Sequence, residues 1–248
     1  MLTGEEALRY SRHIKLPSFG TEAQLKLKTA RVLIIGVGGL GSPAALYLAA
    51  AGVGTIALMD GDKVSLSNLQ RQIAHFSSDL GKGKVLSACE KLQALNPLIR
   101  VETIGEFLAP DNAEQIINSY DFIIDAIDDI EAKFLINDVC VKSGKPFSHA
   151  ALLQYEGHTF TYVPGSACLR CIFGAPPPEG TVQTCSQAGV LGAVAGLLGT
   201  IQAAEAIKYF TSIGSLLTNQ LLTVDALTFS FSSIKVSPNP NCKHLCEL

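Results

Sequence analysis

The chain has 248 residues, 48% of them hydrophobic and 17% charged, which is enough to bury a substantial core in one large α/β domain. Its net charge of −3 and the lack of any run of basic residues argue against a positively charged surface of the kind that binds nucleic acid or a membrane. Because the N-terminus has no secretion-signal pattern and no apolar run resembles a membrane span, we expect a cytoplasmic protein.

The first 29 residues predict a helical arm. We expect a helix over 5–14, with Leu8 and Ile14 on its buried side, because its apolar residues recur at helical spacing. A second short helix over 23–27 leads to the first strand of a sheet.

That strand runs into a glycine-rich turn and then a helix. Residues 32–35 are apolar without alternation, which is typical of a parallel strand covered on both faces. Gly36, Gly38 and Gly41 fit the G-x-G-x-x-G spacing, in which missing Cβ atoms allow a phosphate to approach backbone N–H groups. Asp60 ends the next strand about 20 residues later, where a ribose hydroxyl would be bound. The pattern predicts a nucleotide with an adenosine-like end; the alternative is a turn that only packs a helix on a sheet.

Strands and helices alternate up to residue 151, and then the pattern changes. An alternating segment at 157–163 and a hairpin over 220–236 predict antiparallel strands, and a helix over 191–209 is apolar nearly all round, as a buried or subunit-interface helix would be. We therefore expect a Rossmann-like doubly wound sheet, mainly parallel and extended by antiparallel C-terminal strands.

Polar residues gather where such sheets bind ligands, beyond the carboxyl ends of the strands. The loop 61–72 is too long for a simple turn and carries Asn68 and Arg71, while Lys84 opens the next helix and Asp128 follows the fourth strand. The three donors could clamp a triphosphate, and Asp128 could hold Mg²⁺ through one carboxylate. Any one of them could instead be a surface residue, but together they favour MgATP over a dinucleotide.

The seven cysteines include two closely spaced pairs, Cys168 with Cys171 and Cys242 with Cys246. Four thiolates from two turns are the donor set of a closed, structural tetrahedral Zn²⁺ site. The longer spacing of the second pair leaves His244 as an alternative fourth ligand. A redox dithiol at the first pair and two metal-free pairs are the other readings.

Cys185 stands apart from both pairs, between a proline-rich passage and the start of a helix. A helix N-terminus favours a thiolate, so this cysteine could be a nucleophile. A small residue that merely packs is the equally weighted alternative. Cys89 and Cys140 lie within predicted helices and are expected to pack.

Several of these segments, in this order along the chain, together resemble the MoeB/ThiF family of bacterial relatives of ubiquitin-activating enzymes. They are Arg9-Tyr-Ser-Arg12, the glycine turn up to Ser42, the loop from Asp60 to Asn68-Leu-Gln-Arg-Gln72, Asp125-Ala-Ile-Asp128 and the two cysteine pairs. The resemblance implies an adenylyltransferase that uses MgATP to adenylate the C-terminal glycine of a small ubiquitin-like sulfur-carrier protein ending in Gly-Gly. Pyrophosphate would leave, and the carrier would be ready for thiocarboxylate formation in molybdopterin, thiamine or related sulfur biosynthesis.

The resemblance also implies roles for individual residues. Gly39 would lie against the nucleotide, Asp60 would bind the ribose, Asp128 would bind magnesium, and the phosphates would be held by Asn68, Arg71 and Lys84. Arg12 resembles an arginine that such homodimers insert into the neighbouring active site. Cys185 aligns with the cysteine that joins the activated carrier covalently in ThiF-like members and that MoeB-like members do without. Sulfur transfer would use Cys185 as an intermediate, or a persulfide donor protein instead. Lys133, where an arginine is common, is expected to touch the substrate.

Within the single domain expected over 1–248, the resemblance implies an N-terminal arm (1–29), a nucleotide-binding half (30–151) and a zinc-knuckle and carrier-binding half (152–248). Two other functions remain as alternatives. A NAD-dependent dehydrogenase would explain the glycines and Asp60 but would leave the phosphate donors and the cysteine pairs unused. A non-catalytic nucleotide-binding scaffold would use the same pocket without chemistry.

Overall fold

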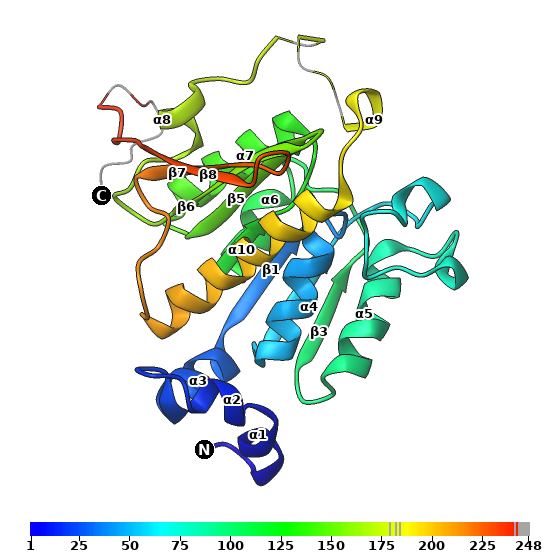
Figure 1. The fold of residues 1–248 in the computed structure, drawn as a ribbon, viewed down its shortest axis with the longest axis vertical. Helices are drawn as coiled ribbons and strands as arrows, with labels where there is room; N and C mark the ends of the chain where they lie inside the picture. Colours follow the sequence, from blue (N-terminus) through cyan, green and yellow to red (C-terminus); the bar gives the residue numbers. More distant parts are fainter. Residues whose placement is uncertain (179, 182, 184, 241, 243–248) are drawn as a thin grey trace.

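The computed structural model describes residues 1–178, 180, 181, 183, 185–240 and 242, and the side chains of residues 185 and 186 lie outside this description. One eight-stranded sheet runs through the molecule in the order β3-β2-β1-β4-β5-β6-β7-β8, with helices on both faces (Figure 1). Its strands are β1 (Arg31–Ile35), β2 (Thr55–Met59), β3 (Arg100–Ile104), β4 (Phe122–Asp125), β5 (Phe147–Leu153), β6 (Glu156–Tyr162), β7 (Gln220–Asp225) and β8 (Ser230–Lys235).

The first five strands are parallel and the last three are antiparallel to their neighbours, which confirms the predicted fold class. The helices are α1 (Gly4–Arg9), α2 (Ser11–Ile14), α3 (Gly20–Thr29), α4 (Gly41–Ala51), α5 (Lys84–Leu95), α6 (Ala113–Asn118), α7 (Ile130–Lys142), α8 (Leu169–Phe173), α9 (Cys185–Ala188) and α10 (Gly192–Thr211). Short 3₁₀ turns occur at Leu66–Asn68 and Ser77–Asp79. None of the helices in the described ranges is both long and apolar enough to cross a bilayer.

Two hydrophobic cores lie on opposite faces of the sheet, because successive strand residues point to opposite sides. Val32 and Ile34 of β1 pack with α3, α4, α5 and α10, whereas Leu33 and Ile35 pack with α6 and α7. All four are at most 1% exposed. This double cover explains why β1 is a continuous apolar run.

The N-terminal arm differs from the prediction. The expected single helix is divided at Tyr10 into α1 and α2, and Leu8 is 77% exposed, so the prediction that it is buried was wrong. Glu6 is buried instead, because it closes a capping box with Thr3 and pairs with Lys28 at 2.8 Å. The Tyr10 ring fills the space beside Gly52 at the C-terminus of α4, where its hydroxyl accepts a hydrogen bond from Asn96 (2.9 Å).

Helix α10 is apolar nearly all round, as predicted, but it is buried on one face only. Val194, Leu198 and Ala203 on one face are buried against the sheet and α4, whereas Leu197 and Ile201 on the other are partly exposed. Gln202 is the polar exception within the buried face, since its Nε2 donates to the backbone oxygens of Asp125 (2.8 Å) and Ser148 (2.9 Å). The helix therefore ties together the carboxyl end of β4 and the neighbouring part of β5.

Candidate functional site

The glycine turn joins β1 to α4 at the carboxyl edge of the sheet. Gly36 has φ +93°, and a Cβ there would lie 2.6 Å from the backbone oxygen of Ala126, just beyond β4. A Cβ on Gly41 would lie 1.9 Å from the oxygen of Gly36. Only glycine allows the turn to close this tightly on itself and on the end of β4.

The backbone at Val37, inside this turn, is held from both sides. Its N–H donates to Asp60 Oδ2 (2.9 Å), and its carbonyl oxygen lies 2.9 Å from His75 Nε2. Since a carbonyl can only accept, Nε2 carries the proton, and Nδ1 then accepts from the hydroxyl of Ser87 at 2.9 Å. Burial lowers the pKa of His75, which keeps the ring neutral in this arrangement. His75 was not predicted from the sequence, because its partner is 38 residues away.

Asp60 and Lys84 lie beside the turn. The second carboxylate oxygen of Asp60 accepts from the backbone N–H of Asp62 (2.9 Å), and the Asp60 side chain is 8% exposed. Lys84, the first residue of α5, has its Nζ 3.5 Å from Asp60 and 2.7 Å from Asp62. The Lys84 ammonium group and the Asp60 carboxylate, which is predicted to bind a ribose, are therefore adjacent at the carboxyl edge of the sheet.

The loop after β2 brings Arg71 to the turn, whereas the described contacts of Asn68 stay within the loop. Methylene carbons of Arg71 lie 3.4–3.5 Å from where a Cβ of Gly39 would be, and its guanidinium donates to the oxygen of Ser67 (3.1 Å). Asn68 is half-buried and closes a 3₁₀ turn by accepting from the N–H of Ser65 (3.3 Å). A Cβ built on Gly38 would lie 3.4 Å from the side-chain amide nitrogen of Gln72, which is buried.

Asp128 lies in the short loop between β4 and α7, at the same sheet edge as the turn. It is exposed, and within the described residues no hydrogen bond or ion pair involves its carboxylate. Its neighbour Asp129 instead caps α7 by accepting from the N–H of Ala132 (2.7 Å). The exposed carboxylate is therefore available to an ion or a ligand.

Arg12 does not join this group. It lies on α2, which follows Tyr10, and Tyr10 packs against Gly52 at the far end of α4 from the glycine turn. An eleven-residue helix is on the order of 16 Å long, so α4 separates Arg12 from its own chain's turn. Arg12 is exposed.

A buried charge cluster beneath the site was not predicted. Asp125 at the end of β4 is fully buried and accepts from Lys133 Nζ (3.0 Å) and His149 Nδ1 (2.7 Å). Burial alone would raise the pKa of Asp125, but the Lys133 charge and the hydrogen bond from His149 outweigh it and lower that pKa. Lys133 also donates to the oxygen of Ala150 (2.7 Å) and is only 6% exposed, so the expectation that it touches substrate was wrong.

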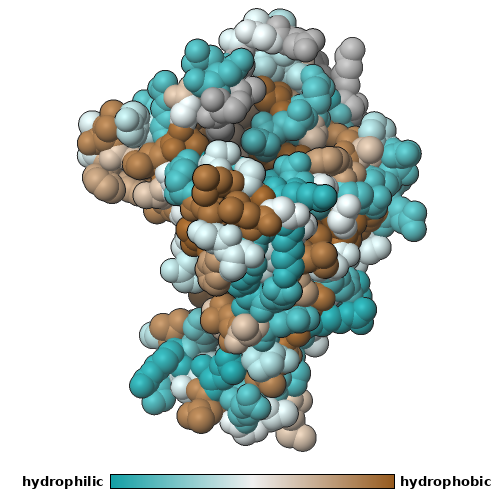
Figure 2. Space-filling model, turned by 90° about the vertical axis from the view of Figure 1, so that its right-hand side faces the viewer, coloured by the Kyte–Doolittle hydropathy of each residue, from teal (hydrophilic) through white to brown (hydrophobic). Residues whose placement is uncertain are grey.

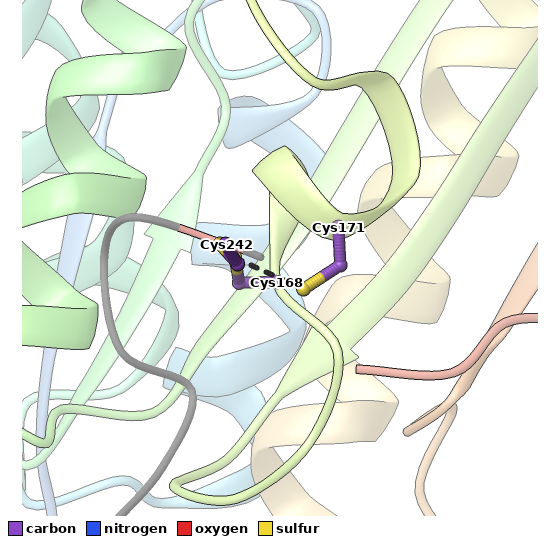
Figure 3. Close-up of side chains that lie close together, drawn as sticks. All are labelled: Cys168, Cys171 and Cys242. Carbon is purple, nitrogen blue, oxygen red and sulfur yellow. Dashed lines mark hydrogen bonds between the residues drawn. The ribbon is translucent and has the colours of Figure 1, made fainter. Parts of the chain in front are cut away.

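Three cysteine sulfurs meet where α8 approaches the C-terminal segment (Figure 3). Cys168 Sγ lies 3.7 Å from Cys171 Sγ and 3.8 Å from Cys242 Sγ, and none of the three forms a disulfide. Zn–S bonds of about 2.3 Å place tetrahedral sulfur ligands about 3.8 Å apart, so the spacing fits Zn²⁺. The N–H of Asn239 also donates to Cys171 Sγ (3.3 Å).

The remaining cysteine predictions differ in outcome. Cys246 and His244 lie outside the described residues, as does the side chain of Cys185, although α9 begins at Cys185 as a helix start was expected there. Cys140 is buried and Cys89 half-buried, as packing residues should be, and burial raises the pKa of both thiols.

Comparison with known proteins decides the family. The ThiF family model matches residues 10–244, nearly the whole chain. The chain belongs to the ThiF family. This confirms the resemblance and gives no support to the dehydrogenase alternative.

The relatives include proteins of two lengths. The Thermus thermophilus sulfur carrier protein adenylyltransferase is 42% identical over 97% of this chain and 91% of its own length. The adenylyltransferase and sulfurtransferase MOCS3-1 of Zea mays is 43% identical over 99% of this chain, which spans only 53% of that relative. Among solved structures, Escherichia coli MccB with ATP matches with a TM-score of 0.83 at 25% identity, over 95% of this chain and 73% of that one.

The buried cluster makes a stability prediction. Lys133→Met should cost about 3–5 kcal/mol of unfolding free energy, because it leaves the carboxylate of Asp125 without its cation. Lys142→Met is the matched control, since Lys142 pairs with Glu114 at 2.9 Å on the surface and should cost at most about 1 kcal/mol. Urea unfolding at pH 7 measures both.

The same pair of variants tests the pH dependence. Because the folded-state pKa of Asp125 is lowered, its stabilisation is present above the ordinary carboxyl value of about 3.9 and is lost as the pH falls through the folded value. The difference between wild type and Lys133→Met should therefore shrink below about pH 4. Equal stabilities of the two methionine variants at pH 7 would contradict the assigned role.

Proposed function

We propose that this protein uses MgATP to adenylate the C-terminal glycine of a small ubiquitin-like sulfur-carrier protein. The observation that carries the proposal is the clamped glycine turn, with Asp60, Lys84 and Arg71 gathered against it at one sheet edge. Membership of the ThiF family supports it, as does a relative of nearly equal length whose name is sulfur carrier protein adenylyltransferase.

The proposed reaction needs positioning and charge neutralisation rather than a general base. A carboxylate oxygen of the carrier attacks the α-phosphorus of ATP, and the bond to pyrophosphate breaks. The glycine turn offers backbone N–H groups to the phosphates, and Asp60, already fixed by two N–H donors, accepts from the ribose hydroxyls. Arg71, Asn68 and Lys84 supply side-chain donors to the phosphates.

Asp128 would hold Mg²⁺, which neutralises charge on the phosphates when bound. An exposed carboxylate at the same sheet edge as the glycine turn, with no hydrogen-bond or ion-pair partner among the described residues, suits this role. Lys84 must exchange its contact with Asp62 for the phosphates, and the 55% exposure of Asp62 lets that carboxylate turn to solvent.

A zinc ion held by Cys168, Cys171 and Cys242 would be structural, because the site lies at the joint between α8 and the C-terminal segment. Either Cys246 or His244 would be the fourth ligand. Its effect would be to pin the last residues to the body of the domain. The proposed division of the chain is an arm (1–29), a nucleotide-binding half (30–151) and a zinc-knuckle and carrier-binding half (152–248), although β5 (Phe147–Leu153) runs across the boundary between the two halves.

The active site is proposed to be completed across a homodimer by Arg12. Its own glycine turn lies at the opposite end of α4, so a neighbouring subunit is the natural recipient. Apolar patches on the side of the molecule that carries α5 and the loop before it supply surface for such contact (Figure 2). The exposed large apolar side chains of that segment are Leu66, Ile73, Phe76, Leu80, Leu86 and Leu95.

After adenylation, sulfur must replace AMP on the carrier. Either the outer sulfur of a persulfide donor protein attacks the acyl carbon and AMP leaves, which gives an acyl disulfide that a thiol then reduces to the thiocarboxylate, or the Cys185 thiolate attacks first and gives a thioester as AMP leaves. In the second route, hydrosulfide from a sulfur donor displaces Cys185 as the free thiol and leaves the thiocarboxylate on the carrier. Molybdopterin, thiamine and related sulfur pathways would all use such a product.

Carrier-dependent ATP–pyrophosphate exchange tests the activity. Carriers ending in Gly-Gly should support exchange in the presence of Mg²⁺, and Asp128→Ala should lower the rate at least 100-fold because the metal loses its protein ligand. Asp121→Ala is the control, since Asp121 precedes the same strand at its other end. Wild-type exchange in Asp128→Ala would exclude the magnesium role, and no exchange with any carrier would favour a non-catalytic scaffold.

Elemental analysis tests the metal. Purified protein should hold one zinc per chain, Cys168→Ser should lose it, and Cys89→Ser, altered at a cysteine outside the cluster, should keep it. If Cys246 is the fourth ligand, Cys246→Ser weakens zinc retention and His244→Ala does not; the reverse result assigns His244. A metal-free wild type of unchanged stability would refute the site.

Subunit mixing tests the role of Arg12. Arg12→Ala and Asp128→Ala should each be inactive alone. After random exchange about half the dimers are mixed and each holds one intact site, so about a quarter of wild-type activity should return. If activity stays absent although light scattering and tagged subunits show exchange, Arg12 acts within its own chain or not at all.

Mass spectrometry tests Cys185. Cys185→Ala should retain full pyrophosphate exchange, because adenylation comes first, yet form no thiol-sensitive adduct between enzyme and carrier. An unmodified wild-type enzyme, together with full sulfur transfer by Cys185→Ala, would make this cysteine a packing residue.

A further inference from the structure

An exposed aromatic ring lies directly beside the ribose acid. Phe107 follows β3, the strand next to β2 in the sheet, and is 60% exposed. A Cβ built on Gly61 would lie 2.7 Å from two carbons of the Phe107 ring. The ring therefore rests on the backbone of the residue that follows Asp60, and only the absence of a side chain at Gly61 lets it come so close.

The loop that carries this ring is fixed on both sides. Leu108 is 8% exposed and packs in the core under α6, so its neighbour Phe107 is directed outward. Asn112 accepts from the N–H of Ala109 (2.9 Å) and donates to the oxygen of Phe107 (3.0 Å). The N–H of Asp60 also donates to the oxygen of Ile104 at the end of β3 (3.2 Å). These bonds fix the backbone at Phe107 relative to the backbone at Asp60, and the exposed ring extends from that fixed position.

We infer that the Phe107 ring is the platform on which the adenine of ATP stacks. This rests on the proposed function, which places the ribose at Asp60; the base is attached to that ribose and must lie within a few ångströms of it. A preformed flat apolar surface at that position is what a purine π-face binds, and every base has such a face. Phe107 accordingly adds affinity for the base, while the phosphate contacts are made elsewhere.

Calorimetric titration of the protein with ATP and with tripolyphosphate, which has no base, separates these contributions. Phe107→Ala should weaken ATP binding about 5-fold or more, in line with the measured range for stacked bases, and leave tripolyphosphate binding unchanged. Phe107→Tyr should bind ATP like wild type, since it keeps the ring. Tyr47→Ala, which removes an aromatic side chain of similar exposure (57%) from α4, is the matched control and should not change ATP affinity.

Substitution of Gly61 gives an independent test of the inference. Gly61→Ala should weaken ATP binding because its Cβ displaces the ring, but it should have no further effect in the Phe107→Ala background, where there is no ring to displace. ATP affinity that is unchanged in Phe107→Ala overturns the inference, and so does an equal loss for ATP and tripolyphosphate. A protein that binds ATP through Phe107 but shows no carrier-dependent exchange would refute the proposed function and leave this inference intact.

Discussion

The site depends on the clamp at Val37. Two short hydrogen bonds, from its N–H to Asp60 and from His75 to its carbonyl, fix the turn between β1 and α4 to the end of β2 and to the long polar loop. A turn that binds phosphate through backbone N–H groups cannot be held by those same groups, so it must be held elsewhere. The two hydrogen bonds at Val37 hold the turn in place, and neither of them involves the backbone N–H groups of Gly38 and Gly39. The clamp also gives Asp60 two tasks, since the carboxylate that would bind the ribose also shapes the phosphate turn.

A second fixed point lies under the other side of the turn. Gly36 packs on the backbone of Ala126, which follows Asp125, and the Asp125 carboxylate is gripped by Lys133 and His149. Gln202 of α10 holds the backbone oxygen of the same residue. A buried ion pair is a poor source of net stability, but its directional bonds fix where β4 ends. The loop with Asp128 begins directly after Asp125, and Asp128 lies three residues beyond it, so the cluster fixes the point from which the proposed magnesium ligand extends.

Much of this could be predicted from the sequence, because the features with local signatures are tightly constrained. The glycine spacing and Asp60 predict a nucleotide-binding turn, and the change from apolar runs to alternation after residue 151 predicts the antiparallel end of the sheet. What could not be predicted depends on distant partners. His75 has no local sequence signature. Lys133 has the sequence context of a residue on the surface of a helix, and only the folded chain shows that it pairs with Asp125. Leu8 is exposed because the arm buries Glu6 and Tyr10 instead, and the spacing of the apolar residues does not indicate this.

In the proposed reaction, a carboxylate oxygen of the carrier attacks the α-phosphorus of ATP at this turn. The most direct measurement uses a carrier labelled with ¹⁸O in its C-terminal carboxylate, with mass spectrometry of the nucleotide released after the acyl adenylate is cleaved by a thiol. Attack at the α-phosphorus leaves one carboxylate oxygen on phosphorus, so we expect AMP that carries one ¹⁸O, together with pyrophosphate. Unlabelled AMP, or ADP and phosphate as the products, would contradict the proposed reaction.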